Sequence, residues 1–232
     1  MKRHNPQLER RLSTALQASP EALKDVLASL SNADFRTAGY LLGERLLPQL
    51  DGEAYWAIFA CIVPSSPKAY LGTFLKAAVA IQKKGQLLLS DARFAAFASQ
   101  ASAIDRRKTL ETLLPHTLSV ADCGQLVQLF AREDNALDIA AQLVATGTPA
   151  AYYELLQLLR RYDVADADVR TVCLALLRRA DGRSFRMARL LQAYFGIEEL
   201  PATFSFPIAD YELSRLDGNY EQFRKLLENV KQ

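Results

Sequence analysis

The chain has 232 residues, of which 50% are hydrophobic and 23% are charged, and its formal net charge is +2. A net charge so close to zero does not indicate that the protein binds nucleic acid or a membrane surface through its overall charge. The three separated cysteines exclude a framework of disulfides and indicate a reducing compartment.

The first residues do not resemble a signal peptide, because Lys2 and Arg3 are followed by polar residues and not by an apolar segment. The longest apolar runs, such as residues 55–63, are far shorter than the roughly 20 residues of a membrane span. We therefore expect a cytoplasmic protein that does not enter a membrane.

Three helix starts share a pattern of serine or threonine followed by proline, at Ser19, Ser66 and Thr148. A hydroxyl at the N-cap accepts a hydrogen bond from a free amide of the first turn. Proline at the next position has no amide to leave unsatisfied, and its φ angle already suits a helix. Each of the three residues is therefore predicted to cap a helix.

Helices are predicted along the whole chain, since apolar residues recur at helical spacing between stops at proline and glycine. We expect them near residues 7–18, 20–30, 33–50, 53–63, 67–84, 91–102, 104–114, 120–132, 135–146, 149–162, 167–180, 185–196, 209–216 and 219–230. The alternation of apolar and polar residues that is typical of strands is absent, so an all-α fold is predicted.

The spacing of these motifs favours a repeat. The three helix starts lie 47 and then 82 residues apart, and the second interval is about two periods of 41. Residues 33–37 (ADFRT) are echoed by residues 167–171 (ADVRT). Periods of roughly 40 to 47 residues are typical of solenoids built from pairs or triplets of helices.

Residues 166–177 (DADVRTVCLALL) resemble the second helix of a HEAT repeat, whose consensus has an acidic residue, then Val-Arg, then small and leucine positions. Residues 34–38 (DFRTA) are a poorer match. The resemblance implies a right-handed helical-repeat array, a HEAT-like α-solenoid of antiparallel helix pairs with about 12 to 14 helices. An irregular helical bundle is the alternative.

The domain organisation follows from the same resemblance. Residues 1–196 are expected to form the helical-repeat domain. Pro201 and Pro207 interrupt the next segment, so residues 197–232 are expected to contain a non-helical crossover and C-terminal helices that pack on the same domain. The chain is therefore expected to be a single domain.

Arginines gather on the helices between residues 160 and 189. Residues 151–196 contain eight arginines and five acidic residues, whereas residues 197–232 contain four basic and seven acidic residues. Arginine suits planar contacts with carboxylate or phosphate, and the spacing places these side chains opposite the apolar stripe of their helices. The predicted partner-binding residues are Arg170, Leu174, Arg178, Arg179, Arg183, Arg186 and Arg189.

We find no motif for catalysis, for a metal or for a cofactor, so no catalytic, metal-binding or cofactor-binding residue is predicted. HEAT-like proteins mostly bind other macromolecules, so the resemblance implies a non-enzymatic scaffold or adaptor with a protein partner, here an acidic segment. The alternative is nucleic-acid binding through the arginines, because some HEAT-like proteins are DNA glycosylases. A further alternative is that the acidic C-terminal segment covers the arginines within the same chain.

Overall fold

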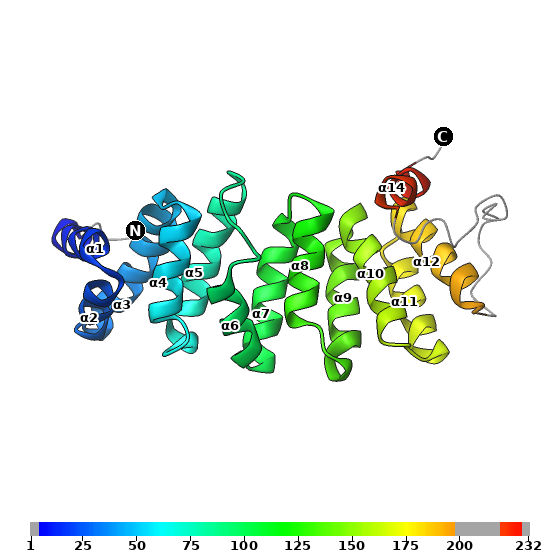
Figure 1. The fold of residues 1–232 in the computed structure, drawn as a ribbon, viewed down its shortest axis with the longest axis horizontal. Helices are drawn as coiled ribbons and strands as arrows, with labels where there is room; N and C mark the ends of the chain where they lie inside the picture. The colour runs from blue at the N-terminus through cyan, green and yellow to red at the C-terminus, as the bar shows by residue number, and fades with distance from the viewer. Residues whose placement is uncertain (1–4, 198–218, 229–232) are drawn as a thin grey trace. The chain divides into compact units, whose positions relative to one another are not determined.

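A computed structural model of the protein describes residues 5–197 and 219–228, and within these two ranges it contains helices and no strand. The all-α prediction is confirmed (Figure 1). The α-helices are α1 (Pro6–Ala18), α2 (Pro20–Ala28), α3 (Asn32–Leu41), α4 (Gly52–Ile62), α5 (Pro67–Gln82), α6 (Ala92–Gln100), α7 (Ala103–Leu113), α8 (Val120–Phe130), α9 (Ala136–Thr146), α10 (Pro149–Arg161), α11 (Asp166–Arg178), α12 (Gly182–Phe195) and α14 (Tyr220–Glu228).

Most helix ends agree with the predicted ones to within two or three residues. The predicted helix 209–216 and the predicted crossover 197–208 lie, apart from Ile197, outside the described residues. The helix predicted at 219–230 is described over Tyr220–Glu228.

The helix predicted over residues 33–50 is helical over Asn32–Gln49, but its second half is not a regular α-helix. α3 ends at Leu41 and is followed by a π-helical turn, Leu42–Leu46, and a 3₁₀ turn, Leu47–Gln49. The physical reason is Pro48, which has no amide to donate to the carbonyl of Glu44 and whose ring would press against that carbonyl in an α-helix. A wider turn, in which the Leu47 amide donates to Leu42, replaces the regular pattern.

Two of the three predicted caps are confirmed. The Ser19 hydroxyl accepts from the Ala22 amide at 3.0 Å, and the Thr148 hydroxyl accepts from Ala151 at 3.2 Å. The prediction for Ser66 is wrong: α5 begins at Pro67 as expected, but the described structure shows no capping hydrogen bond to the Ser66 side chain. With φ −153° and ψ 61°, the Ser66 backbone departs from the extended conformation of Ser19 and Thr148.

The helices divide into two compact units, residues 1–118 and 119–232. In the first unit, α1, α3, α5 and α7 contact one another in succession, and α2, α4 and α6 do the same. Its core holds an aromatic cluster, in which the buried Trp56 ring stacks on Phe94 at 4.6 Å and Phe59 meets Phe97 edge-on at 5.1 Å. Trp56 also donates its indole hydrogen to the Leu88 carbonyl at 2.9 Å.

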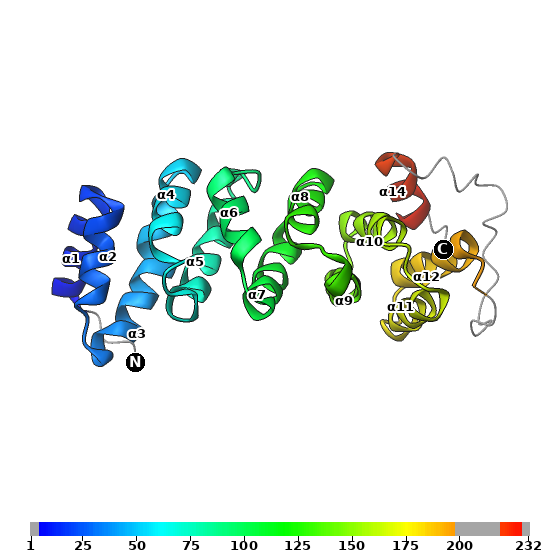
Figure 2. The ribbon, with the colours of Figure 1, turned by 60° about the horizontal axis from the view of Figure 1, so that its bottom comes forward.

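The second unit is centred on α10. This helix contacts α8, α9 and α14, while α11 contacts α9 and α12. Figure 2 allows these helices to be followed from a second direction. α10 buries most of its length, because apolar residues occupy nearly every position of its central two turns, among them Leu155, Leu156 and Leu159. The contacts of α14 with α10 and α12 place residues 220–228 on this unit.

Candidate binding surface

The seven residues predicted to bind a partner lie on two helices that pack against each other. Arg170, Leu174 and Arg178 lie on α11, and Arg179 is the C-cap of that helix. The other three, which are Arg183, Arg186 and Arg189, lie on α12. α11 and α12 make the most extensive contact in the second unit, so the arginines are close in space as well as in sequence.

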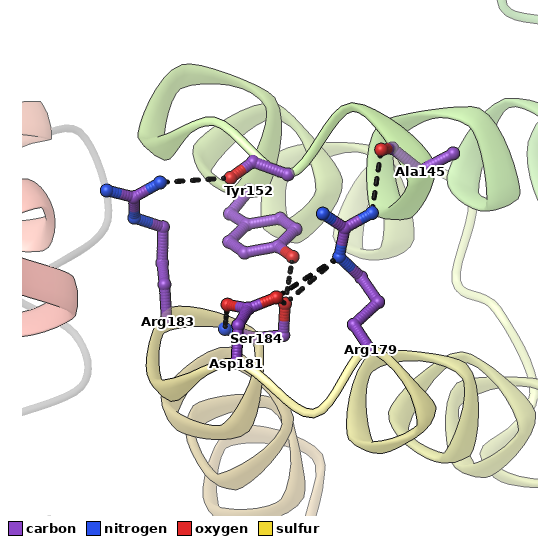
Figure 3. Close-up of polar contacts among 7 residues, drawn as sticks. Ala145, Tyr152, Arg179, Asp181, Arg183 and Ser184 are labelled. Carbon is purple, nitrogen blue, oxygen red and sulfur yellow. Dashed lines mark hydrogen bonds and ion pairs between the residues drawn. The ribbon is translucent and has the colours of Figure 1, made fainter.

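Arg179 and Arg183 bind the C-terminal end of α9 (Figure 3). Arg179 donates to the Ala145 carbonyl at 2.7 Å and Arg183 donates to the Gly147 carbonyl at 3.3 Å. The last carbonyls of a helix have no partner within the helix and carry its partial negative charge. The two guanidinium groups therefore satisfy and partly neutralise this helix end.

Gly147 makes this approach possible. It is the C-cap of α9, with φ +70°, a conformation that suits glycine. A Cβ atom at this position would lie 2.5 Å from the Arg179 guanidinium. A side chain at residue 147 would therefore be strained in its backbone and would also displace Arg179.

A polar network that begins at the buried Tyr152 and Ser184 orients Arg179, which is exposed (Figure 3). The Tyr152 hydroxyl lies 2.6 Å from the Ser184 hydroxyl, Ser184 donates to Asp181 at 2.6 Å, and Arg179 donates to Ser184 at 3.2 Å. Burial raises the pKa of Tyr152. Burial alone would raise the pKa of Asp181 too, but hydrogen bonds from Ser184 and Arg179 outweigh it and the pKa is lowered. The network ties α10 to the start of α12.

Arg186 is buried, and its predicted exposure is wrong. Only 4% of the residue is exposed, and its guanidinium donates to the carbonyls of Leu226 and Leu227 at 3.3 and 3.0 Å. These carbonyls belong to the last turn of α14. The helical spacing correctly placed Arg186 away from the apolar stripe of its own helix, but α14 covers that side. Burial lowers the pKa of Arg186.

Arg189 is partly buried and lies along its own helix. Its guanidinium donates to the Gln192 side chain at 2.6 Å and lies over the Phe185 ring, 5.4 Å from the ring centre. Arg170 and Arg178 are exposed and Leu174 is half-buried. The exposed basic surface is therefore smaller than predicted and is centred on α11.

A shallow apolar groove of about 120 Å³ runs between α9 and α11, and sequence reasoning missed it. Leu137, Ala141 and Val144 line it on α9, and Asp168, Thr171, Val172 and Ala175 line it on α11. Leu137 is 42% exposed. Arg178 follows Ala175 by one turn of α11, so a basic residue lies close to one end of the groove.

Glu154 on α10 is a second residue that sequence reasoning missed. It is 8% exposed, and its carboxylate lies against α8 where Gly124 leaves room: a Cβ at Gly124 would be 2.9 Å from a carboxylate oxygen. Burial raises the pKa of Glu154 to about 7, although the charge of Arg161 lowers it somewhat. Glutamate at a helical position gives no sign in the sequence that it is buried.

The described residues contain no group of three or more His, Cys, Asp or Glu side chains that could hold a metal ion. Within the same part of the chain, no helix is both long enough and apolar enough to cross a membrane. Comparison of the chain with protein-family models, with curated proteins and with solved structures gave no match.

Proposed function

We propose that the protein is a non-enzymatic, HEAT-like helical-repeat scaffold that binds a protein partner. The observation that carries this proposal is the order of helix contacts in the first unit, where α1, α3, α5 and α7 form one succession and α2, α4 and α6 another. Each helix there packs on helices one or two places away along the chain, as expected of a repeat array. The second unit is similar, with α8 on α10 and α9 on α11.

The proposed partner is an acidic protein segment, and the proposed binding site is the groove between α9 and α11 together with the exposed arginines of α11. The apolar side chains of the groove, such as Leu137, would take an apolar side chain of the partner. Arg178 and Arg170 would attract its carboxylates. Arg179 and Arg183 bind α9 and Arg186 binds α14, so we propose that these three arginines stabilise the fold and do not contact the partner.

The binding proposal is tested by charge reversal of α11. Partners are isolated from the native host, and their affinity for the purified chain is measured for Arg170→Glu/Arg178→Glu and for Arg36→Glu, an exposed arginine of α3. Each exposed charge pair is worth up to about 1 kcal/mol, so the loss of two pairs should weaken binding by up to about thirtyfold. The control should bind normally. Equal binding by all three chains would overturn the proposal.

The repeat architecture is tested by small-angle scattering. A compact chain of this length has a radius of gyration of about 17 Å, whereas a repeat array is extended and exceeds it clearly. A value near that of a compact chain would favour the irregular bundle. Gel shifts with duplex DNA at two salt concentrations test the alternative function, because binding through phosphates weakens steeply as salt rises.

A further inference from the structure

α14 binds the rest of the second unit through three apolar side chains on one face. Phe223, Leu226 and Leu227 are 0%, 3% and 2% exposed. The ring of Tyr153 on α10 meets the rings of Tyr220 and Phe223 edge-on, at 5.6 and 5.3 Å. Aromatic side chains held in this way are the usual anchors of a helix in a groove. We call the surface of α10 and α12 that α14 covers the α14-binding surface.

Arg186 supplies the polar part of this binding. It donates to the carbonyls of Leu226 and Leu227, which lie in the last turn of α14. These bonds are made to the backbone, so they do not select a particular side chain of the helix.

The polar side chains of α14 lie on its outer face. Arg224 binds Glu221 at 2.9 Å and Glu228 at 3.2 Å, and all three side chains are at least 39% exposed. The α14-binding surface therefore contacts two features: an aromatic residue followed by aliphatic residues three and four positions later, and the backbone carbonyls of those aliphatic residues.

The described part of α14 meets the rest of the second unit through this one apolar face and through the two carbonyls that Arg186 binds. A helix held in this way can be replaced by another that offers the same anchors.

We propose that the α14-binding surface is a binding site for an amphipathic helix of a protein partner, and that α14 is its internal competitor. The partner helix carries an aromatic residue with aliphatic residues three and four positions after it, and the backbone carbonyls of these aliphatic residues bind Arg186. This inference extends the proposed protein-binding function to a second surface, and it does not depend on the exposed arginines of α11.

The test measures binding of a labelled peptide with the sequence of residues 219–232 to the full-length chain by fluorescence anisotropy. Phe223→Ala weakens α14 in the chain, so the peptide should bind this variant at least about tenfold more tightly than the wild type. Arg224→Ala, which alters the outer face of α14, is the matched control and should behave as the wild type. Circular dichroism checks that the chains are equally folded, and Leu227→Ala provides a second weakened chain.

A second peptide keeps Tyr220, Phe223, Leu226 and Leu227 and exchanges the polar residues among themselves. It should bind the Phe223→Ala chain within about threefold of the first peptide, since the anchors are unchanged. Combining Phe223→Ala with Arg186→Met should remove most of the binding, and Arg186→Lys should restore part of it. Adding Arg178→Glu should have no effect, which separates this site from the one in the proposed function.

Three results would overturn the inference. Failure of both weakened, folded chains to bind either peptide would show that the surface accepts no helix in trans. Binding of the natural peptide alone would show that it is specific to α14. A concentration-dependent dimer of the wild type in sedimentation, lost in the Phe223→Ala chain, would show that the occupant is α14 of a second copy and not a different protein.

Discussion

The core of the first unit and the core of the second unit are stabilised by different kinds of contact. In the first unit, the rings of Trp56, Phe59 and Phe94 pack against one another, and burial of aromatic area dominates. In the second unit, a core of leucines and of buried rings such as Tyr152 and Phe223 is combined with arginines that bind helix carbonyls, such as Arg179 on α9 and Arg186 on α14. The difference shows that arginines of a basic stretch of sequence can bind groups of the same chain and so be unavailable to a partner.

This comparison changes how the arginine-rich stretch is interpreted. A guanidinium group that binds carbonyls at a helix C-terminus replaces the water that would otherwise satisfy them, and its charge is used within the chain. Arg179 and Arg183 are of this kind and Arg186 binds carbonyls of α14, whereas Arg178 is exposed. Charge counted along a sequence therefore overstates the charge that a partner can meet.

The largest expected effect is on the aromatic cluster of the first unit. Phe59 is fully buried among other rings, so Phe59→Ala should lower the free energy of unfolding by about 3 to 5 kcal/mol. Ile104→Ala, at a residue 78% exposed, should change it by less than about 0.5 kcal/mol. Urea titration of both variants measures the difference. A small effect of Phe59→Ala would show that the aromatic cluster does not dominate the stability of the first unit.

Glu154 should make the second unit sensitive to pH. Its pKa of about 7 in the folded chain lies above the ordinary 4.5, so the folded state binds more protons between these values and stability falls as pH rises through them. Glu154→Gln should therefore stabilise the chain at pH 8, by an amount on the order of 3 kcal/mol, and have little effect near pH 4.

The control for Glu154 is Glu21→Gln, an exposed position of α2 in the first unit. Its variant should follow the pH dependence of the wild type, because an exposed carboxylate gains little from its protein surroundings. Thermal melts at pH 4, 6 and 8 provide the measurement. If Glu154→Gln failed to raise the melting temperature at pH 8, the carboxyl would be better solvated than its burial against Gly124 implies.

The smallest effects concern the helix caps, which occur in both units. Ser19→Ala and Thr148→Ala should each cost about 1 kcal/mol, because each hydroxyl accepts from an amide of the first turn. Ser66→Ala should cost less than about 0.5 kcal/mol, since no capping bond to its side chain is described. Equal losses at all three positions would mean that Ser66 caps α5 in solution.

The helices could be predicted from the sequence because their starts and ends are local. Ser19-Pro20, Thr148-Pro149 and Gly147 act within one or two turns, and each has its expected role in the structure. The π-helical turn at Leu42–Leu46 could have been suspected from Pro48, but its form depends on how the chain avoids the Glu44 carbonyl.

The candidate site was less predictable, because it depends on contacts between helices that are distant in the sequence. Periodicity correctly placed Arg186 away from its own apolar stripe, but the helix that covers it begins at Tyr220. Glu154 and Leu137 are ordinary residues of amphipathic helices in the sequence. Their burial and exposure follow from the packing of α8 against α10 and of α9 against α11.

Arginines of α11 and α12 that bind backbone carbonyls stabilise the fold, and a comparison of unfolding free energies tests this most directly. The free energies of unfolding of Arg179→Met, Arg186→Met and Arg178→Met are compared by urea titration at pH 7. We predict a loss of about 1.5 to 3 kcal/mol for Arg186, whose buried guanidinium binds two carbonyls, a smaller loss for Arg179, which binds a carbonyl at an exposed position, and less than about 0.5 kcal/mol for Arg178, which is exposed. Equal effects at the three positions would contradict the claim.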